Sequence, residues 1–386
     1  MLTEFEVNNF RKFSNIKIHD LSKMNLFFGV NNVGKTSMLE ALFAYSCGAN
    51  IHPFFNYIIP HRIQENNTFT MNGPYKAAEL ILNVFHDIAE GDTMRCSFSG
   101  KIDGKDIKVQ HQFMPGQIFS GFIPNEMGNF ETTEPISKPS NIKVEIQGIM
   151  SIPVPKVPLG TWKVSTTNEQ KFKFEMDYPD FRNVNSSAKP LIMAKMDDIL
   201  AHQNEIENKK IYSLLLRSRL LEQVIEEMNR SFAGLDLENI ENIPYPDGTE
   251  ASLSCRFKDK RVVPMYMLGD GVRRWFNIIG NMVAYKKSIH CIEEIDVNFH
   301  HKAQGPLAIQ LYQYARKFQN QVFATSHSGE FLYSFLQGIH DEVGDALLTD
   351  DIRVITLRNV KGVVKARTLT GKAALTAMDD GLELRV

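Results

Sequence analysis

The sequence contains little of what marks secreted, membrane-bound or zinc-binding proteins. Its four cysteines lie far apart and form no Cys-x-x-Cys pair: Cys47, Cys96, Cys255 and Cys291. Neither a zinc site nor a disulfide framework is expected from such spacing. No apolar run approaches the ~20 residues that span a bilayer, and Glu4, Glu6 and Arg11 interrupt any signal-peptide core. We therefore expect a cytoplasmic protein with reduced thiols and no membrane contact.

Charge of one sign is also scarce. The 43 Lys and Arg residues nearly balance 45 Asp and Glu residues, which leaves a net charge of −2. This balance argues against a surface dominated by nucleic-acid binding, although it leaves room for a local basic groove. Repeats and low-complexity tracts are absent, as is the Asn-Lys-x-Asp motif with which GTPases read the base. The 386 residues allow two or three domain-sized units, or one domain with insertions.

A phosphate-binding motif is present near the N-terminus. Residues 29–36 read Gly-Val-Asn-Asn-Val-Gly-Lys-Thr, the P-loop pattern. The mostly apolar residues 24–28 before it predict a strand, and the apolar spacing after it predicts a helix. Amide groups of the glycine turn would face phosphate oxygens, Lys35 would reach the β- and γ-phosphates, and the Thr36 hydroxyl would ligate Mg²⁺. The residues expected to contact the nucleotide here are Gly29, Asn31, Asn32, Gly34, Lys35, Thr36 and Ser37.

Other segments give a coarse outline of the chain. Residues 1–20 alternate as two short strands would, and residues 77–90 look helical or partly helical. Residues 94–148 are strand-like, whereas residues 149–190 are rich in Pro, Ser, Thr and Asn and predict an irregular surface excursion.

The clearest predicted helix covers residues 211–232, with one apolar stripe. It fits a helix packed on the core, or an arm for a partner or for DNA. We divide the chain into an ATPase lobe with the P-loop (1–120), a central excursion with this helix (121–240) and a second ATPase lobe (241–386).

Two later apolar runs end in polar side chains. Residues 288–292 are followed by Glu293 and Glu294, and residues 321–326 are followed by His327. At the carboxyl ends of parallel strands, where ligands bind, the first acid would hold Mg²⁺ and the second would polarise water. The histidine could sense the γ-phosphate. A solvated acid pair and a histidine without a role fit the same residues when each segment is taken alone.

A glycine turn separates the excursion from these strands. Gly269, Asp270 and Gly271 precede apolar residues at helical spacing, beginning with Trp275. The exposed amides of such a turn suit an anion. Gly-Asp-Gly is also a common turn, so this signal is weak by itself.

The order of these motifs resembles the ABC-type ATPase head. It is most similar to the OLD-like (overcoming-lysogenization-defect) branch, which shares that head with RecF and SMC proteins. The resemblance covers residues 1–90 and 260–386. It implies an α/β fold: an ABC-type P-loop ATPase head with a mixed sheet and a partly helical central insertion. Within it, residues 268–272 replace the Leu-Ser-Gly-Gly-Gln signature, and Glu293 and Glu294 match the Asp-Glu of the Walker B motif.

The resemblance also implies roles for single residues. Asp296 lies at the D-loop acid, His300 matches a histidine that often follows, and His327 looks like the switch histidine. Residues 9–13 match an N-terminal segment in which a basic side chain approaches the nucleotide. The expected ligands are ATP and Mg²⁺. The expected catalytic residues are Glu294 and His327, and the expected metal ligands are Thr36 and Glu293. The additional residues expected to contact the nucleotide are Arg11, Lys12, Gly269, Asp270, Gly271 and Asp296.

Two positions depart from the family pattern. Glu293 stands where aspartate is usual, and its extra methylene moves the carboxylate by about one bond length, although Mg²⁺ demands near-octahedral geometry. Gly269 stands where the signature usually has serine, which removes one hydroxyl donor. We therefore expect an ATPase with slow turnover, which holds ATP more readily than it hydrolyses it.

The resemblance further implies partners. The signature of one ABC-type head closes over the P-loop of another, so we expect a homodimer or a larger even assembly. Only 59 residues follow His327, and strand-like stretches at 352–357 and 363–366 occupy many of them, so we expect no Toprim nuclease domain. The chain thus resembles stand-alone ATPase subunits of bacterial anti-phage systems such as PARIS, Septu or retron-associated ATPases.

Those subunits work with a separately encoded nuclease or toxin, and we expect an ATP-driven sensor and scaffold that controls such an effector. The alternative is a RecF- or SMC-like DNA repair ATPase that clamps DNA directly, with a basic groove and salt-sensitive binding. Charges over residues 205–227 are mixed, and a helix over 211–232 is too short for an SMC arm. A GTPase switch is a third hypothesis, which the missing base-reading motif disfavours.

Overall fold

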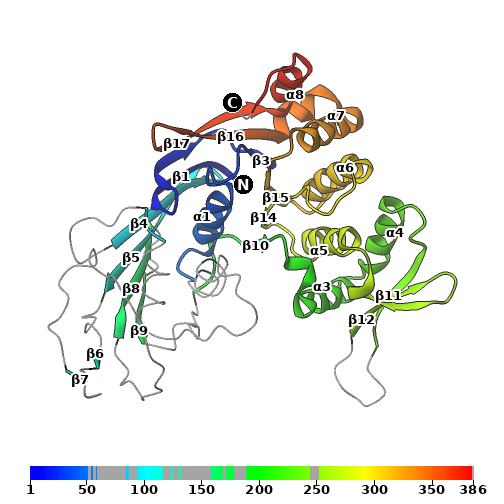
Figure 1. The fold of residues 1–386 in the computed structure, drawn as a ribbon, viewed down its shortest axis with the longest axis horizontal. Helices are drawn as coiled ribbons and strands as arrows, with labels where there is room; N and C mark the ends of the chain where they lie inside the picture. Colours follow the sequence, from blue (N-terminus) through cyan, green and yellow to red (C-terminus); the bar gives the residue numbers. More distant parts are fainter. Residues whose placement is uncertain are drawn as a thin grey trace.

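A computed structural model describes most of the chain. The described residues are 1–50, 54, 58, 84–86, 94–115, 123–124, 130–131, 158–167, 171–177, 188–243 and 252–384. Figure 1 shows two large sheets with helix α1 between them and the other helices on the far side of one sheet. Within the described residues, no helix is both long enough and apolar enough to cross a membrane.

The central sheet is mixed and carries the P-loop strand. Its strands are, in spatial order, β10 (Ala194–Asp197), β14 (Ile289–Ile292), β15 (Gln321–Ser326), β3 (Met24–Phe28), β16 (Ile352–Val360) and β17 (Val363–Thr370). The first five run parallel, and β17 pairs antiparallel with β16. Strands β3, β14 and β15 are buried along their whole length, because helices or a second sheet cover both faces. The parallel order brings the carboxyl ends of these three strands to one edge.

The second sheet is antiparallel. It contains, in spatial order, β2 (Phe13–Ile18), β1 (Leu2–Phe10), β4 (Met94–Ile102), β5 (Lys105–Pro115), β8 (Pro158–Thr166) and β9 (Lys171–Asp177). Helix α1 (Lys35–Cys47) lies between this sheet and the central sheet (Figure 1) and is buried almost all round. A helix enclosed in this way needs apolar residues on every side, and all its residues except Thr36 are buried.

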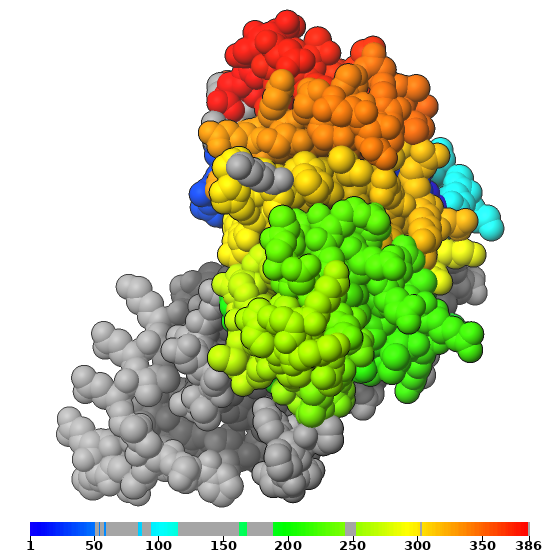
Figure 2. Space-filling view, turned by 90° about the vertical axis from the view of Figure 1, so that its right-hand side faces the viewer, coloured from blue at the N-terminus to red at the C-terminus, as the bar shows by residue number. Residues whose placement is uncertain are grey.

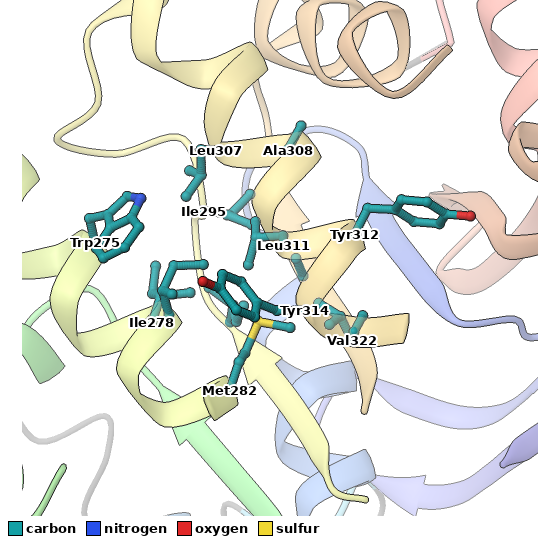
Figure 3. Packing of buried hydrophobic residues seen from close by; sticks show 14 of the residues in the cluster. Trp275, Ile278, Met282, Ile295, Leu307, Ala308, Leu311, Tyr312, Tyr314 and Val322 are labelled. Atoms are coloured by element: carbon teal, nitrogen blue, oxygen red, sulfur yellow. The ribbon is translucent and has the colours of Figure 1, made fainter. Parts of the chain in front are cut away.

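The remaining helices form the other layer of the central sheet. They are α3 (Glu205–Arg217), α4 (Leu221–Ser231), α5 (Asp270–Ala284), α6 (His301–Lys317), α7 (Gly329–Asp351) and α8 (Gly371–Asp379), with short 3₁₀ turns at Ala201–Gln203 and Met265–Met267. Figure 3 shows Trp275, Ile278 and Met282 of α5 facing residues of α6 such as Leu311 in one core. Figure 2 faces this helical side, with α3 and α4 in green below α6 in yellow to gold and α7 in orange. The apolar contacts of this core hold α5 against the central sheet.

A small sheet joins this helical layer. Strands β11 (Leu237–Ile243), β12 (Ser252–Phe257) and β13 (Val262–Pro264) pair antiparallel. A two-stranded ribbon, β6 (Ile123–Pro124) with β7 (Phe130–Glu131), completes the described strands.

The prediction of a single helix over residues 211–232 is wrong. Helix α3 ends at Arg217 and α4 begins at Leu221, because Arg219 adopts a left-handed φ of 56°. The apolar pattern hides the break, since each helix buries its own stripe: Ile211 and Leu215 from α3, Val224 and Met228 from α4. Of the two interpretations of this stripe, core packing is the one that the structure supports.

Several strand predictions are confirmed, and one loop prediction is wrong. The two strands within residues 1–20, the P-loop strand and the strands ending at Glu293 and His327 form as expected, as does the hairpin β16–β17. Strands β8 and β9 lie in the range 149–190, which is predicted to be irregular. The Pro and Ser residues of this range do not prevent β8 from pairing with β5, or β9 from pairing with β8. Most of the helix predicted over 77–90 lies outside the described residues.

The α/β fold class and the mixed central sheet are as predicted. The range 121–240 is partly helical, and two of its strands pair with strands from the ranges on either side: β8 with β5 and β10 with β14.

Candidate functional site

The P-loop follows β3 directly and wraps into α1. Gly29 has a φ of 150° and Gly34 has a φ of 110°. Residues with a side chain rarely adopt these backbone angles. A Cβ at Gly29 would approach the Leu357 carbonyl oxygen to 2.7 Å, and one at Gly34 would lie 3.1 Å from the Phe13 ring. Glycine is therefore required twice, once for each close approach.

The P-loop, the acid loop that follows β14 and the end of β15 line a cavity of about 190 Å³. Its lining combines loop residues with side chains from the carboxyl edge of the sheet: Lys12, Asn31, Asn32, Gly34, Lys35, Thr36, Ser37, Glu294 and Thr325. Six of the seven P-loop residues predicted to contact the nucleotide line it. The seventh, Gly29, is not in the lining, but its carbonyl oxygen accepts a hydrogen bond from Lys35.

Lys35 is folded back onto its own loop. It is 7% exposed, and its Nζ donates to the carbonyl oxygens of Gly29 at 2.8 Å and Val30 at 3.0 Å. Burial lowers the pKa of Lys35, and the carboxylates of Glu294 and Asp296 oppose that effect. In this structure the Lys35 ammonium is therefore held by two main-chain carbonyl oxygens of the P-loop.

The two acids after β14 face different partners. The Thr36 hydroxyl hydrogen-bonds to the Glu293 carboxylate across the gap between α1 and β14. Glu294 lines the cavity, and its main chain adopts a left-handed φ of 43°. Its amide donates to the Thr325 hydroxyl at 2.8 Å, which joins the acid loop to β15.

Thr325 was missed by the sequence analysis. It lies in β15, two residues before the predicted switch histidine, and it contacts both the cavity and the acid loop. A polar residue near the end of a predicted buried strand was the available signal, but such residues are common.

Arg11 does not line the cavity, unlike the neighbouring Lys12. The Arg11 guanidinium forms an ion pair with Glu40 at 3.3 Å, and both side chains are buried. It also donates to the Ile58 carbonyl at 2.8 Å. Of the two basic residues predicted to contact the nucleotide, Lys12 lines the cavity and Arg11 does not.

His327 and Asp296 lie next to the cavity rather than in its wall. His327 lines a neighbouring cavity of about 820 Å³ together with Phe28 and the start of α7. Asp296 is near enough to Lys35 to act on its pKa. His300 is exposed and packs against His301, with the ring centroids 4.0 Å apart and the ring planes tilted by 38°.

The glycine turn begins α5, as predicted, but lies outside this chain's own P-loop cavity. Gly269 is the N-cap of α5, and the Asp270 carboxylate pairs with Arg273. Gly271 packs so closely that a Cβ would meet the Asn298 carbonyl oxygen at 2.6 Å. The turn thus contacts the loop that follows Glu294, not the P-loop.

Comparisons with known proteins agree with this geometry. The AAA ATPase domain family matches residues 1–243 and 189–332. The chain is 23% identical to an ATP/GTP phosphatase of Helicobacter pylori over 358 residues, 89% of each protein. A stretch of 63 residues is 38% identical to the DNA replication and repair protein RecF of Coxiella burnetii, 16% of each protein.

Among solved structures, an SMC head bound to the C-terminal winged-helix domain of ScpA superimposes with a TM-score of 0.50. The match covers 97% of this chain and 99% of that one at 10% identity, so the likeness is one of fold. The finer resemblance to the OLD-like branch stays a prediction. The chain belongs to the AAA ATPase domain family, and its fold is that of an ABC-type P-loop ATPase head.

Proposed function

We propose that the protein binds ATP with Mg²⁺ in the P-loop cavity and hydrolyses it. One observation carries this proposal: Lys35, Thr36 and Glu294 meet in one cavity although more than 250 residues separate the acid from the loop. Transfer of a phosphoryl group to water needs a cation for the phosphate charge, a metal ligand and a carboxylate that orients the water. These three side chains supply that set.

Thr36 and Glu293 fit the metal. Their oxygens already contact one another, and hydroxyl and carboxylate oxygens are ligands that Mg²⁺ accepts, with water and phosphate oxygens completing its shell. When bound, Mg²⁺ would neutralise charge on the phosphates. Lys35 would donate to the β- and γ-phosphates, Glu294 would orient the attacking water, and His327 would contact the γ-phosphate from the neighbouring cavity.

A second copy of the chain completes the site in this proposal. Gly269, Asp270 and Gly271 are outside the P-loop cavity of their own chain, so they would close over the nucleotide of a partner, with Asp296 near the interface. A homodimer or larger even assembly that closes on ATP follows from this arrangement.

The test compares ATP binding by wild-type protein with that of Lys35→Ala. We expect loss of measurable ATP binding at nucleotide concentrations that saturate the wild type, because Lys12, the other cation in the cavity lining, is exposed and lies outside the P-loop. The exposed Lys372, which pairs with Asp345 far from the site, gives the matched control Lys372→Ala. Wild-type ATP affinity in Lys35→Ala would contradict the assignment.

We further propose that this ATPase acts as the sensor and scaffold of an anti-phage complex and controls a separately encoded nuclease or toxin. This role rests on the family resemblance of the motifs. Co-purification of the native protein with the product of a neighbouring reading frame, dependent on Lys35, is the expected outcome. Tight ATP-dependent DNA binding without any protein partner would favour the alternative function instead.

That alternative, a RecF- or SMC-like ATPase that clamps DNA, is favoured by one surface. Strands β16 and β17 place Arg358 directly opposite Lys365, and no acidic residue occurs between residues 352 and 378. Like charges opposite one another destabilise a sheet, so an anionic partner would relieve the repulsion. Exposed Lys361 and Arg367 extend the basic surface.

Salt dependence tests it. If these four cations contact phosphates, log K for duplex DNA falls with log salt at a slope of about −4. Replacing Lys365 and Arg367 by Glu should flatten that slope; an unchanged slope would exclude this hairpin as a DNA surface.

A further inference from the structure

A buried arginine joins α5 to the acid loop. Arg274 lies three residues after Gly271 and is 2% exposed. Its guanidinium donates to three main-chain carbonyl oxygens: Glu293 at 2.6 Å, Glu294 at 2.9 Å and Ile199 at 3.1 Å. No side chain of the proposed ATP site receives these bonds, so Arg274 acts on the backbone of the two acids.

The backbone that Arg274 holds is a strained one. Glu294 has a φ of 43°, which a residue with a side chain rarely adopts. Such a conformation persists where its surroundings fix it from several sides. Here Arg274 binds the carbonyl of Glu294, while Thr325 binds its amide. This conformation directs the Glu294 side chain to the P-loop cavity.

Carboxylates near Arg274 favour a positive charge at this buried position. Burial lowers the pKa of the guanidinium, and the carboxylates of Asp197, Asp296 and Glu294 oppose that effect. A neutral side chain of similar size would leave those acids and three carbonyls without a shared cation. Lysine would keep the charge but lacks the planar fork of five donors.

Helix α5 has further links to the same loop. Asn281 donates to the Asp197 carboxylate at 2.7 Å, and the Asp197 carbonyl accepts from the Glu293 amide at 2.9 Å. Trp275, next to Arg274, is buried in the core that α5 shares with α6 (Figure 3). A shift at the start of α5 therefore reaches Glu293 and Glu294 through a packed, hydrogen-bonded path.

We propose that Arg274 is a positioning residue for hydrolysis: it holds the main chain of Glu293 and Glu294 so that the Glu294 carboxylate faces the P-loop cavity. The inference rests on the proposed ATPase function. Because Gly269 to Gly271 begin the same helix and would contact a partner's nucleotide, Arg274 connects closure of that second site to the acid of its own site.

Two variants of the full-length chain test this role, Arg274→Met and Arg274→Lys. Each is compared with wild type for ATP affinity and for phosphate release per folded molecule. We expect ATP affinity within about threefold of wild type and a kcat lowered by about 10²-fold in Arg274→Met, the lower end of what a catalytic base contributes. Arg274→Lys should recover part of the rate, because an ammonium can bond some of the three carbonyls.

A second buried arginine provides the control. Arg353 is 8% exposed and donates to the carbonyls of Asp20, Thr349 and Ile352, away from the cavity. Arg353→Met should lower thermal stability as Arg274→Met does, yet leave kcat unchanged. Equal loss of kcat in the two variants would overturn the proposal, since general destabilisation would then explain both.

The Glu294→Gln background shows whether Arg274 acts through Glu294. If it does, adding Arg274→Met to Glu294→Gln changes the residual rate by less than about threefold. Additive losses would overturn the proposed route. Should Arg274→Met fail to fold, Arg274→Lys is measured alone, and wild-type kcat in that variant refutes the need for the fork. A wild-type chain without ATP turnover would instead overturn the proposed function itself.

Discussion

Gly34 offers a sharp test of whether the P-loop cradle requires its present backbone. In Gly34→Ala the new Cβ would lie 3.1 and 3.2 Å from two Phe13 ring atoms and 3.3 Å from the Lys12 Cβ. Phe13 is 1% exposed in the core and has little room to move. The left-handed φ of 110° adds strain of about 1–3 kcal/mol, and overpacking adds about 1–3 kcal/mol.

These terms together disfavour the cradle by roughly 2–6 kcal/mol. Because α1 and β3 remain packed, we expect the loop to rearrange rather than the protein to unfold. ATP must then restore the cradle on binding, and each 1.4 kcal/mol costs a factor of ten in affinity. Titration with a fluorescent ATP analogue should show binding at least about 30-fold weaker, with a folded protein by thermal melting.

Gly104→Ala is the matched control. Gly104 has a φ of 80° in the turn between β4 and β5, and no heavy atom lies within 4 Å of its ideal Cβ. It should lower stability through strain alone and leave ATP affinity unchanged. A folded Gly34→Ala protein that binds ATP within threefold of wild type would refute the reasoning.

Three further outcomes are expected. Glu294→Gln should bind ATP normally and lose at least about 100-fold in phosphate release; turnover at the wild-type rate would refute its role. Arg11→Met should cost about 3 kcal/mol in urea denaturation by removing the ion-pair partner of the buried Glu40 carboxylate, and Glu40→Met added to it should restore much of this; unchanged stability would contradict the ion pair. Burial lowers the pKa of His111 to about 3, whereas the unfolded chain takes up this proton near pH 6.5. Stability should therefore fall by about 2 kcal/mol between pH 6.5 and 5, and in His111→Gln this contribution should disappear; an unaltered pH dependence would argue against it.

The motifs that could be found from the sequence each lie within one short run of residues. The P-loop could be read because one short run contains strand, turn and helix, and each follows from apolar period and glycine placement. The strands before Glu293 and His327 could be predicted for the same reason. The break at Arg219 could not, because the apolar stripe of α3 continues in α4 without a glycine or proline to mark it.

Arg11 and Lys12 show what a sequence pattern cannot predict: which of two adjacent basic residues lines the cavity. Both are basic and adjacent, and only the fold decides that Arg11 pairs with a buried carboxylate while Lys12 lines the cavity. Buried charges need a partner close in space, and the sequence does not say which carboxylate α1 brings there.

The P-loop motif and the strands that end in polar residues could be predicted from the sequence, because a glycine turn before a helix and a buried strand are each encoded within a few neighbouring residues. Which distant residues share the cavity depends on the packing of the whole chain. The strand order β14-β15-β3 places Glu294 and Thr325 beside Lys35 and brings Arg274 to the carbonyls of the acid loop. That order depends on how whole strands and helices pack, which no short segment records.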